Sequence, residues 1–399
     1  MSQTWSTPLE TYQYVTGYNT YLQSMGSDSS GALYVSGYGY DANMTMHWLV
    51  QKSVNSGSTW VVLDDYQLSP GKNAMPSAAG LFVTGNNIFV TGQATDTSGV
   101  LHSIIRQSTN AGLTWNTDND YQYTIGQNSM GGQIASGQTG TLYVLTTGVD
   151  GAKKYHAVVR SSSDAGTTWS VVDDFMYGGD NVLSANEIAV SPQGEIFTAG
   201  SAEDADGNNH WYVRMGSSNG STWSTVDDFV YSAGFGSAPS TTIAFDSNAS
   251  VYVTGSGDDG FGSHWVVRKG EATGASWATI DDYQYQTGAG SVAGGLFEDA
   301  QSNFYVFGTG QDQTKFNEMH FNVRKSSDMG SSWTTVENYF YAAASGTGQG
   351  TSFGGFTVTP TGSVYTALSA TDGGGQWHGL ILSMPCVTPS PTPTATPIN

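Results

Sequence analysis

The seven histidines of this 399-residue chain recur at nearly constant intervals, each 54 to 58 residues after the one before. They are His47, His102, His156, His210, His264, His320 and His378. In six cases an aspartate lies six residues earlier, namely Asp41, Asp96, Asp150, Asp204, Asp258 and Asp372. In the remaining case Asp312 lies eight residues before its histidine. A neighbouring imidazole and carboxylate can bind the hydroxyl groups of a ligand, because together they supply hydrogen-bond donors and acceptors.

Tyrosines accompany most of these pairs. Two aromatic residues, two positions apart, end the strand-like segment that leads into a repeat, and residues so spaced share one face of a strand. The second members of these pairs are Tyr14, Tyr123, Tyr177, Tyr231, Tyr285 and Tyr341. Two interpretations compete. In one, the aspartate starts a turn, the histidine bonds across the hairpin and the tyrosine packs between repeats. In the other, the three residues form a shallow carbohydrate site in each repeat, where a sugar ring lies on the aromatic ring.

Two further patterns could carry chemistry. Asp204, Asp206 and Asn208 place oxygens at alternating positions and are candidate calcium ligands, although the loop lacks the closing glutamate of an EF-hand. No other cofactor is expected. Glu187 is the only carboxylate at its position in the innermost strand, and it could form an acid–base pair with Glu203, Asp204 or Asp206. Alternatively, it bonds to a backbone group or lines a wet channel.

Four short runs of β-branched and aromatic residues make up each repeat, and they predict four antiparallel strands, A to D from the inside outward. Seven such units predict an all-β fold, a seven-bladed β-propeller of four-stranded antiparallel blades. The last unit lacks strand D, and residues 4–14 resemble one, so we expect the N-terminal strand to complete the last blade and close the ring. Residues 1–387 should form the propeller, and residues 388–399 a Pro/Thr-rich tail or linker.

The turns between strands C and D share a motif. Residues 161–169 read SSSDAGTTW and residues 325–333 read KSSDMGSSW, while QSTNAGLTW (107–115) and KSVNSGSTW (52–60) carry asparagine instead. These hairpins resemble those of Asp-box (BNR, sialidase-type) propellers, and the chain resembles bacterial surface proteins built from such repeats. In such a turn, glycine allows a left-handed backbone and tryptophan packs beneath. We therefore expect a core position for the motif tryptophans and their N-terminal counterpart, which are Trp5, Trp60, Trp115, Trp169, Trp223, Trp277 and Trp333.

The resemblance indicates a fold and not an activity. A sialidase holds the sugar carboxylate with three arginines from different blades. Here each arginine lies four residues after a repeat histidine, which leaves none for such a triad, so no catalytic residue is predicted. We expect the arginines to bridge to acidic residues of strand D such as Asp173 or Asp227. The five are Arg106, Arg160, Arg214, Arg268 and Arg324.

Composition limits the partners. The chain has 12 Lys and Arg against 33 Asp and Glu, for a net charge of −21, which argues against binding nucleic acid. No apolar run is long enough to insert into a membrane, and Cys386, the only cysteine, cannot form an internal disulfide. We expect an extracellular or bacterial cell-surface module, excised from a longer protein. Its expected function is non-catalytic, multivalent carbohydrate binding of a lectin or adhesin kind, with a glycan or a surface protein as partner. A protein-binding scaffold and a glycoside hydrolase are the alternatives.

Overall fold

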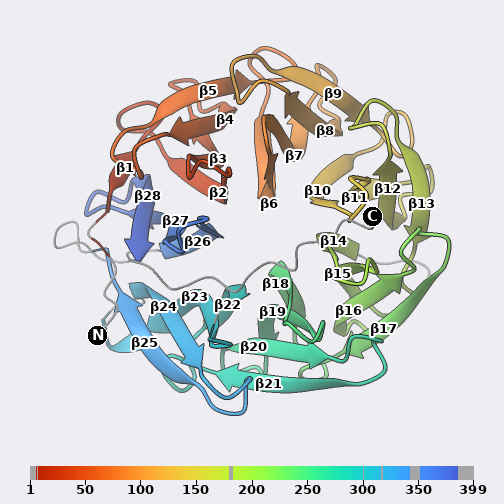
Figure 1. Ribbon diagram of the computed structural model, residues 1–399, viewed down its shortest axis with the longest axis vertical. Coiled ribbons are helices and arrows are strands. Elements are labelled where there is room, and N and C mark those ends of the chain that lie inside the picture. Colours follow the sequence, from red (N-terminus) through yellow and green to blue (C-terminus); the bar gives the residue numbers. More distant parts are fainter. Residues whose placement is uncertain are drawn as a thin grey trace, which may run out of the picture.

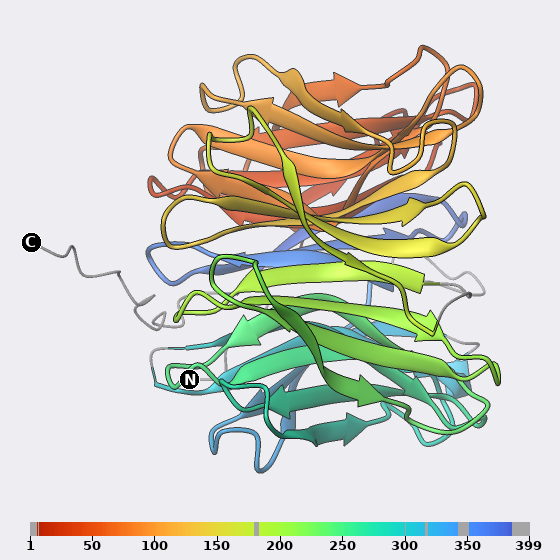
Figure 2. The same ribbon diagram turned by 90° about the vertical axis from the view of Figure 1, so that its right-hand side faces the viewer.

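Twenty-eight strands form seven antiparallel sheets of four, set as blades around a common axis (Figure 1). The computed structural model describes residue 6 and residues 8–178, 183–299, 301–315, 318–341 and 351–384, without the side chains of residues 239–241. The predicted all-β, seven-bladed propeller is therefore confirmed. The strands run from one face of the ring to the other, so that successive loops alternate between the two faces (Figure 2). The tail and Cys386 lie outside the described residues.

Blades 1 to 4 follow the chain in order. Blade 1 contains β2 (Thr20–Ser27), β3 (Leu33–Tyr40), β4 (Met46–Ser53) and β5 (Val61–Tyr66). Blade 2 contains β6 (Ala74–Thr84), β7 (Asn87–Thr95), β8 (Leu101–Ser108) and β9 (Asn116–Tyr121). Blade 3 contains β10 (Ser129–Ser136), β11 (Leu142–Val149), β12 (Tyr155–Ser162) and β13 (Ser170–Phe175). Blade 4 contains β14 (Leu183–Val190), β15 (Ile196–Glu203), β16 (Asn209–Gly216) and β17 (Trp223–Phe229).

Blades 5 to 7 complete the ring. Blade 5 contains β18 (Ser237–Phe245), β19 (Val251–Asp258), β20 (Ser263–Gly270) and β21 (Trp277–Tyr283). Blade 6 contains β22 (Ser291–Glu298), β23 (Phe304–Asp312), β24 (Glu318–Ser326) and β25 (Thr334–Tyr339). Blade 7 contains β26 (Thr351–Val358), β27 (Val364–Thr371), β28 (Trp377–Met384) and, as its outer strand, β1 (Glu10–Tyr12). A single 3₁₀ turn, Gln313–Lys315, is the only helical segment among the described residues, and no described helix is long and apolar enough to cross a membrane.

The N-terminal strand closes the ring as predicted. In β1, Thr11 pairs with Leu380 of β28. The backbone N–H groups of Ser6 and Leu9 extend this pairing by donating to the carbonyl oxygens of Ser383 and Ile381, at 2.9 and 2.8 Å. The regular strand is shorter than the predicted segment 4–14, whose first residues fall partly outside the described chain. Closure removes the free sheet edges that an open ring would expose.

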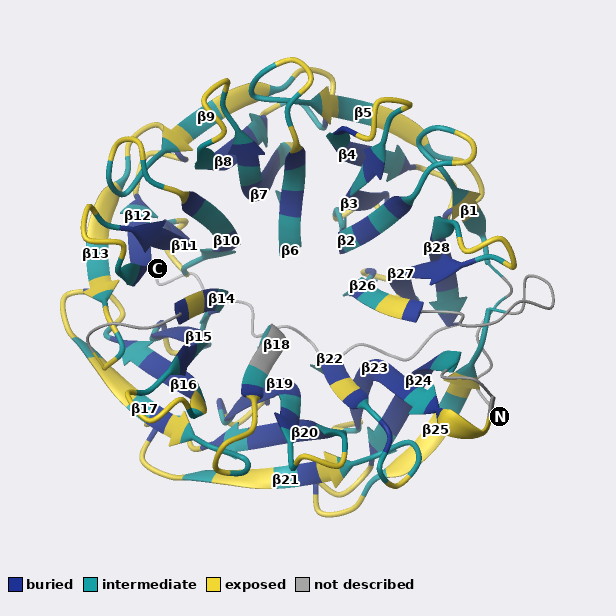
Figure 3. Ribbon diagram, turned by 180° about the vertical axis from the view of Figure 1, so that it is seen from behind, coloured by how far each residue is buried: buried dark blue, intermediate teal, exposed yellow. Residues whose placement is uncertain are grey.

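Burial follows the order of strands within a blade. Strands B and C are largely buried, and every residue of β11 and β27 is buried, whereas the outer strands are exposed on one face (Figure 3). The tryptophans buried completely are Trp48, Trp211 and Trp265, on strand C. The expected core position of the hairpin tryptophans is confirmed in part, because the six described are only half-buried but each packs against a hydrophobic core cluster; Trp5 is not described. In four of the six the indole N–H donates to the carbonyl of the turn glycine, as Trp60 does to Gly57 at 3.1 Å.

One contact recurs where consecutive blades meet, in the regions we call seams. Four arginines each donate two hydrogen bonds, at 2.6–3.0 Å, to a buried or half-buried carboxylate on strand D of the preceding blade. These pairs are Arg106–Asp64, Arg214–Asp173, Arg268–Asp227 and Arg324–Asp281. Each guanidinium also lies 3.9–4.3 Å from the centre of an aromatic ring of the preceding blade. The predicted bridges to Asp173 and Asp227 are thus confirmed as contacts between blades.

The seam between blades 2 and 3 lacks this carboxylate. Arg160 lies over the ring of Tyr121, but its Nη1 donates to the amide oxygen of Asn119, at 2.6 Å, and its buried Nε has no partner among the described residues. Burial lowers the pKa of Arg160 to about 10. A buried guanidinium without a carboxylate partner leaves part of its desolvation cost uncompensated.

We expect Asn119→Asp to raise the free energy of unfolding by about 1–2 kcal/mol at pH 7, because it supplies the missing charged acceptor. In three of the corresponding pairs burial outweighs the arginine and raises the pKa of the aspartate, so the stability of the variant relative to the control should decrease as the pH rises from the unfolded pKa of the new carboxyl to its folded pKa. Urea unfolding at several pH values measures this. Asn116→Asp, at an exposed position of the same strand, is the charge-matched control. Equal urea midpoints for Asn119→Asp and Asn116→Asp would contradict the interpretation that Arg160 lacks a charged partner in this seam.

Candidate functional site

The predicted histidines, aspartates and tyrosines meet on one face of the ring, in groups we call rim units. In blade 1, His47 lies with its ring centre 5.0 Å from that of Tyr14, which comes from the end of the preceding outer strand. Its Nδ1 is 2.7 Å from Oδ1 of Asp65 on strand D, and its Nε2 is 3.6 Å from Oδ2 of Asp41. The Tyr14 hydroxyl donates to Asp65, at 2.7 Å. Asp41 also accepts the backbone N–H groups of its own turn.

The same arrangement recurs in other blades. The distance between the tyrosine and histidine ring centres is 4.5–5.1 Å in five rim units. These pairs are Tyr14–His47, Tyr123–His156, Tyr177–His210, Tyr231–His264 and Tyr285–His320. Asp150 approaches His156 and Asp96 approaches His102, at 3.7 and 3.5 Å. The structure therefore has the contacts of the first interpretation, and it places the groups required by the second on one accessible face.

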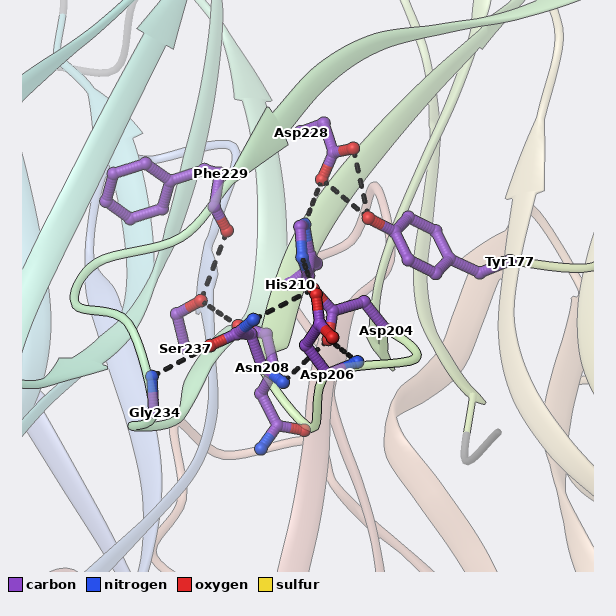
Figure 4. A network of polar contacts seen from close by, with 10 residues as sticks. Tyr177, Asp204, Asp206, Asn208, His210, Asp228, Phe229, Gly234 and Ser237 are labelled. Atoms are coloured by element: carbon purple, nitrogen blue, oxygen red, sulfur yellow. Dashed lines mark hydrogen bonds and ion pairs between the residues drawn. The ribbon is translucent and has the colours of Figure 1, made fainter. Parts of the chain in front are cut away.

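Blade 4 has the tightest rim unit (Figure 4). His210 lies between two carboxylates, with Nδ1 2.6 Å from Asp228 and Nε2 3.1 Å from Asp204, while the Tyr177 hydroxyl donates to Asp228. Ionised carboxylates only accept hydrogen bonds, so both ring nitrogens must carry protons when both bonds form. Burial lowers the pKa of His210, but the bonds to Asp228 and Asp204 outweigh it and the net effect raises that pKa.

Five positions differ from this pattern, and four of them were predicted site residues. In blade 5, Asp259 and not Asp258 faces His264, at 3.4 Å, because Asp258 instead accepts from the backbone N–H of Gly260 and the hydroxyl of Ser263. In blade 2, Leu68 stands where other units have tyrosine. His320 bonds to Asn338 and lies 4.0 Å from Asp312 and 3.8 Å from Glu318. Position 11, which would supply the strand D carboxylate for His378, is threonine, and His378 bonds to Asp372 at 3.0 Å. Tyr341 packs against the hydrophobic cluster of blades 6 and 7.

Sequence reasoning missed the strand D carboxylates of the rim units. They are Asp65, Asp120, Asp174, Asp228 and Asp282, with 39–46% of the side-chain surface exposed. Each follows a residue that bonds to the next blade, usually another aspartate. The repeated Asp-Asp dipeptide was the available signal, because consecutive residues of a strand point to opposite faces.

The calcium candidates form a turn. Oδ1 of Asp204 accepts the backbone N–H groups of Asp206 and Asn208, and Oδ2 accepts the side-chain amide of Asn208 and Nε2 of His210. The Asn208 oxygen accepts the N–H of Gly234, at 2.8 Å. A cation would have to displace these donors. Within the part of the chain that the structure describes, no three His, Cys, Asp or Glu side chains form a group able to hold a metal.

A cavity of about 380 Å³, which we call the axial pocket, lies beside the inner strands of blades 1 to 4. It sits near the starts of these strands and so at the face of the rim units. Strand A has an irregular register in all seven blades, and the irregularities bring Gln23, Asn186 and the long segment of β6 to the pocket. Two methionines, an amide and three hydroxyl residues also line the pocket, namely Met75, Met130, Gln93, Ser77, Thr147 and Ser184. No described lining residue is charged.

Glu187 lies next to Asn186 but is not part of the axial pocket. It is completely buried, and neither of its carboxyl oxygens has a hydrogen-bond partner among the described residues. Burial raises the pKa of Glu187 well above its ordinary value, and the backbone N–H of Thr242 in the next blade only partly offsets the rise. Asp204 is engaged in its own turn at the rim. Asp204 therefore bonds within the rim while Glu187 lies in the core, and complete burial also argues against a glutamate that lines a wet channel.

Known structures share this architecture. No protein-family model and no curated protein sequence matches the chain. An ulvan lyase of polysaccharide lyase family PL25 has a TM-score of 0.61 at 11% identity, over 92% of this chain and 95% of that one. A Dyadobacter fermentans protein of unknown function has a TM-score of 0.53 at 11% identity, covering 94% and 97%. Trypanosoma rangeli sialidase has a TM-score of 0.52 at 12% identity, over 95% of this chain and 58% of the sialidase. The chain shares the β-propeller fold with these proteins. At this identity the likeness extends to fold alone.

The position of His210 predicts its titration. We expect its imidazole to titrate above the ordinary histidine range in a pH series of ¹H–¹⁵N NMR spectra, and Asp204→Asn to lower that pKa by removing one charged acceptor. Because the folded-state pKa is raised, the linked stability is complete below the unfolded pKa and disappears as the pH rises through the folded one. Asp206→Asn removes a charge from the same exposed loop but keeps both bonds to His210, so it should change the titration little. Equal shifts in both variants would show that general charge, and not these bonds, sets the pKa.

Proposed function

We propose that this protein is a non-catalytic carbohydrate-recognition module that binds a neutral glycan in the axial pocket. The observation that carries the proposal is the lining of that pocket, which combines amides, hydroxyls and methionines without charge among its described residues. Amide and hydroxyl groups match the donors and acceptors of sugar hydroxyls, and apolar side chains match the faces of a sugar ring. The volume of about 380 Å³ suits a small ligand rather than a folded partner.

The chemistry of the pocket favours binding over turnover. Glycoside hydrolysis generally needs two carboxyl groups on either side of the scissile bond. The described lining supplies none, and Glu187 is completely buried and is not part of the lining. The similar structures include a polysaccharide lyase and a sialidase, so carbohydrate handling on this fold has precedent, whereas this lining lacks the carboxyl pair of a glycoside hydrolase.

The rim units extend this proposal to multivalent binding. Four of the described strand D carboxylates, Asp65, Asp174, Asp228 and Asp282, keep about two-fifths of the side-chain surface exposed and lie beside a tyrosine–histidine pair. Such groups can bond sugar hydroxyls weakly, and several weak sites on one ring gain affinity for a repetitive glycan. A lectin- or adhesin-like role outside a bacterial cell or on its surface follows from this proposal.

A glycan array that contains neutral and anionic structures, run with and without calcium, tests the function. We expect neutral glycans to bind and to be recovered intact by chromatography. Gln23→Ala and Gln93→Ala should each weaken binding about tenfold, because each removes hydrogen bonds to a ligand. Asn116→Ala, which removes an exposed amide on an outer strand, is the control. Cleavage products would contradict the non-catalytic role, and silence across the array would favour a protein partner instead.

A further inference from the structure

A second pocket, of about 230 Å³, lies in the seam between blades 4 and 5, and we call it the seam pocket. Its lining comes from strands B and C of blade 4 and from the inner three strands of blade 5. The lining residues are Ser201, Asn209, Gly236, Ser237, Ala238, Ser256, Asp258 and Ser263. Most carry a hydroxyl, an amide or a carboxylate, which is unusual for the inner part of a contact between blades.

Gly236 explains why this seam is open. In three other seams an asparagine at the corresponding position accepts, at 3.0 Å, the backbone N–H of the first residue or residues of strand C in the preceding blade. These contacts are Asn19 with Trp377, Asn73 with Met46 and Asn128 with Leu101. Residue 236 has no side chain, so the corresponding residue, Asn209, faces the pocket instead. In the next seam Gly290 occupies the position, but the side chain of Gln311 lies against its N–H.

The polar groups of the seam pocket have bonding capacity left for a ligand. Asp258 accepts one hydrogen bond at each carboxylate oxygen, from Gly260 and Ser263, and each oxygen has a second acceptor site. Ser237 donates to backbone carbonyls of Phe229 and Asn209, and its oxygen can still accept (Figure 4). A ligand whose hydroxyl groups can both donate and accept hydrogen bonds therefore fits Asp258 and Ser237. The carboxylate, with no cation in the described lining, disfavours an anionic ligand.

Two phenylalanine rings belong to the loops that flank the seam pocket. Phe235 precedes Gly236 and lies over Gly260 in the facing loop, with 42% of its surface exposed. Phe261, next in that loop, is 82% exposed. Exposed phenyl rings beside hydroxyl and carboxylate groups offer the apolar surface on which the face of a sugar ring packs.

The seam pocket adjoins the axial pocket through one pair of residues. Ser184 lines the axial pocket and pairs in register with Ser201, which lines the seam pocket. Paired residues of an antiparallel sheet lie on the same face, with Cβ atoms about 5 Å apart. A chain of linked sugar units could therefore reach from one pocket to the other without crossing a blade.

We propose that the seam pocket is a second subsite, which binds a neutral sugar unit of an oligosaccharide whose neighbouring units occupy the axial pocket. This rests on the proposed function, and it specifies the ligand as an extended neutral chain. The axial pocket binds the first units, and Asp258, Ser263 and the exposed phenyl rings bind a unit further along. Affinity should then rise with chain length until the ligand reaches the seam.

Calorimetry with cello-, xylo-, manno- and malto-oligosaccharides of two to six units tests the subsite. We expect affinity for one series to rise with length, and Gly236→Asn, which rebuilds the closing asparagine, to lower affinity for the longest member about tenfold but leave the shortest unchanged. A side chain at position 236 meets no atom within 4 Å at its Cβ, so the variant should fold. Gly290→Asn makes the same change in the next seam and should bind as the unmodified protein does.

The outcomes separate the two proposals. Length-independent affinity, or equal binding by Gly236→Asn and Gly290→Asn, would overturn the seam subsite and leave the axial pocket as the site. Absence of binding in all four series, together with silence on the array, would overturn both. Backbone NMR adds a direct readout, because only ligands long enough to reach the seam should shift the amide signals of Asn209 and Ser263.

Discussion

The ring depends on a guanidinium that is held between an aromatic ring and a carboxylate of the preceding blade. In the seam between blades 4 and 5, Arg268 lies 4.1 Å from the ring centre of Phe229 and bonds to Asp227 with two nitrogens. Apolar side chains also pack between the blades, and such packing holds surfaces together without fixing their register. A planar, bidentate pair fixes the distance and the angle at once.

The same outer strand serves both the seam and the rim. Asp227 and Asp228 are consecutive, so their side chains point to opposite faces of β17. Asp227 bonds to the following blade, whereas Asp228 bonds to His210 of its own blade and to Tyr177 from the preceding strand D. Each such dipeptide thus links three consecutive blades. It follows that the rim units have a structural role whether or not they bind a ligand, and that unique function must come from departures from the repeat.

The sequence predicted most features that all blades share, and few of the features in which single blades differ. The seven units, the strand order and closure by residues near Thr11 followed from periodicity, because a motif written seven times is a strong signal. The half-buried hairpin tryptophans and the choice of Asp259 over Asp258 were missed, since both depend on where a side chain lies relative to the blade edge. The axial pocket was not predicted, because register irregularities in strand A create it and these leave no regular spacing in the sequence. Alignment of the repeats shows that Gly236 replaces the asparagine found at positions 19, 73 and 128. That this replacement leaves a pocket in the seam could be seen only in the structure.

The distribution of charge favours the same class of ligand, a neutral one, at both pockets. The chain carries a net charge of −21, yet the carboxylates of the seams are paired with arginines and those of the rim bond to histidines and tyrosines. A net negative charge of this size disfavours the approach of polyanions. The axial pocket has no described charge, and the seam pocket has one carboxylate, Asp258. Each pocket alone offers only a few hydrogen bonds and modest apolar contact, so a single sugar would bind weakly. A ligand that reaches both gains the second contact at high effective concentration. A neutral, extended glycan has no negative charge to be repelled, and it is long enough to contact both pockets at once. Its weak contacts in the two pockets therefore act together.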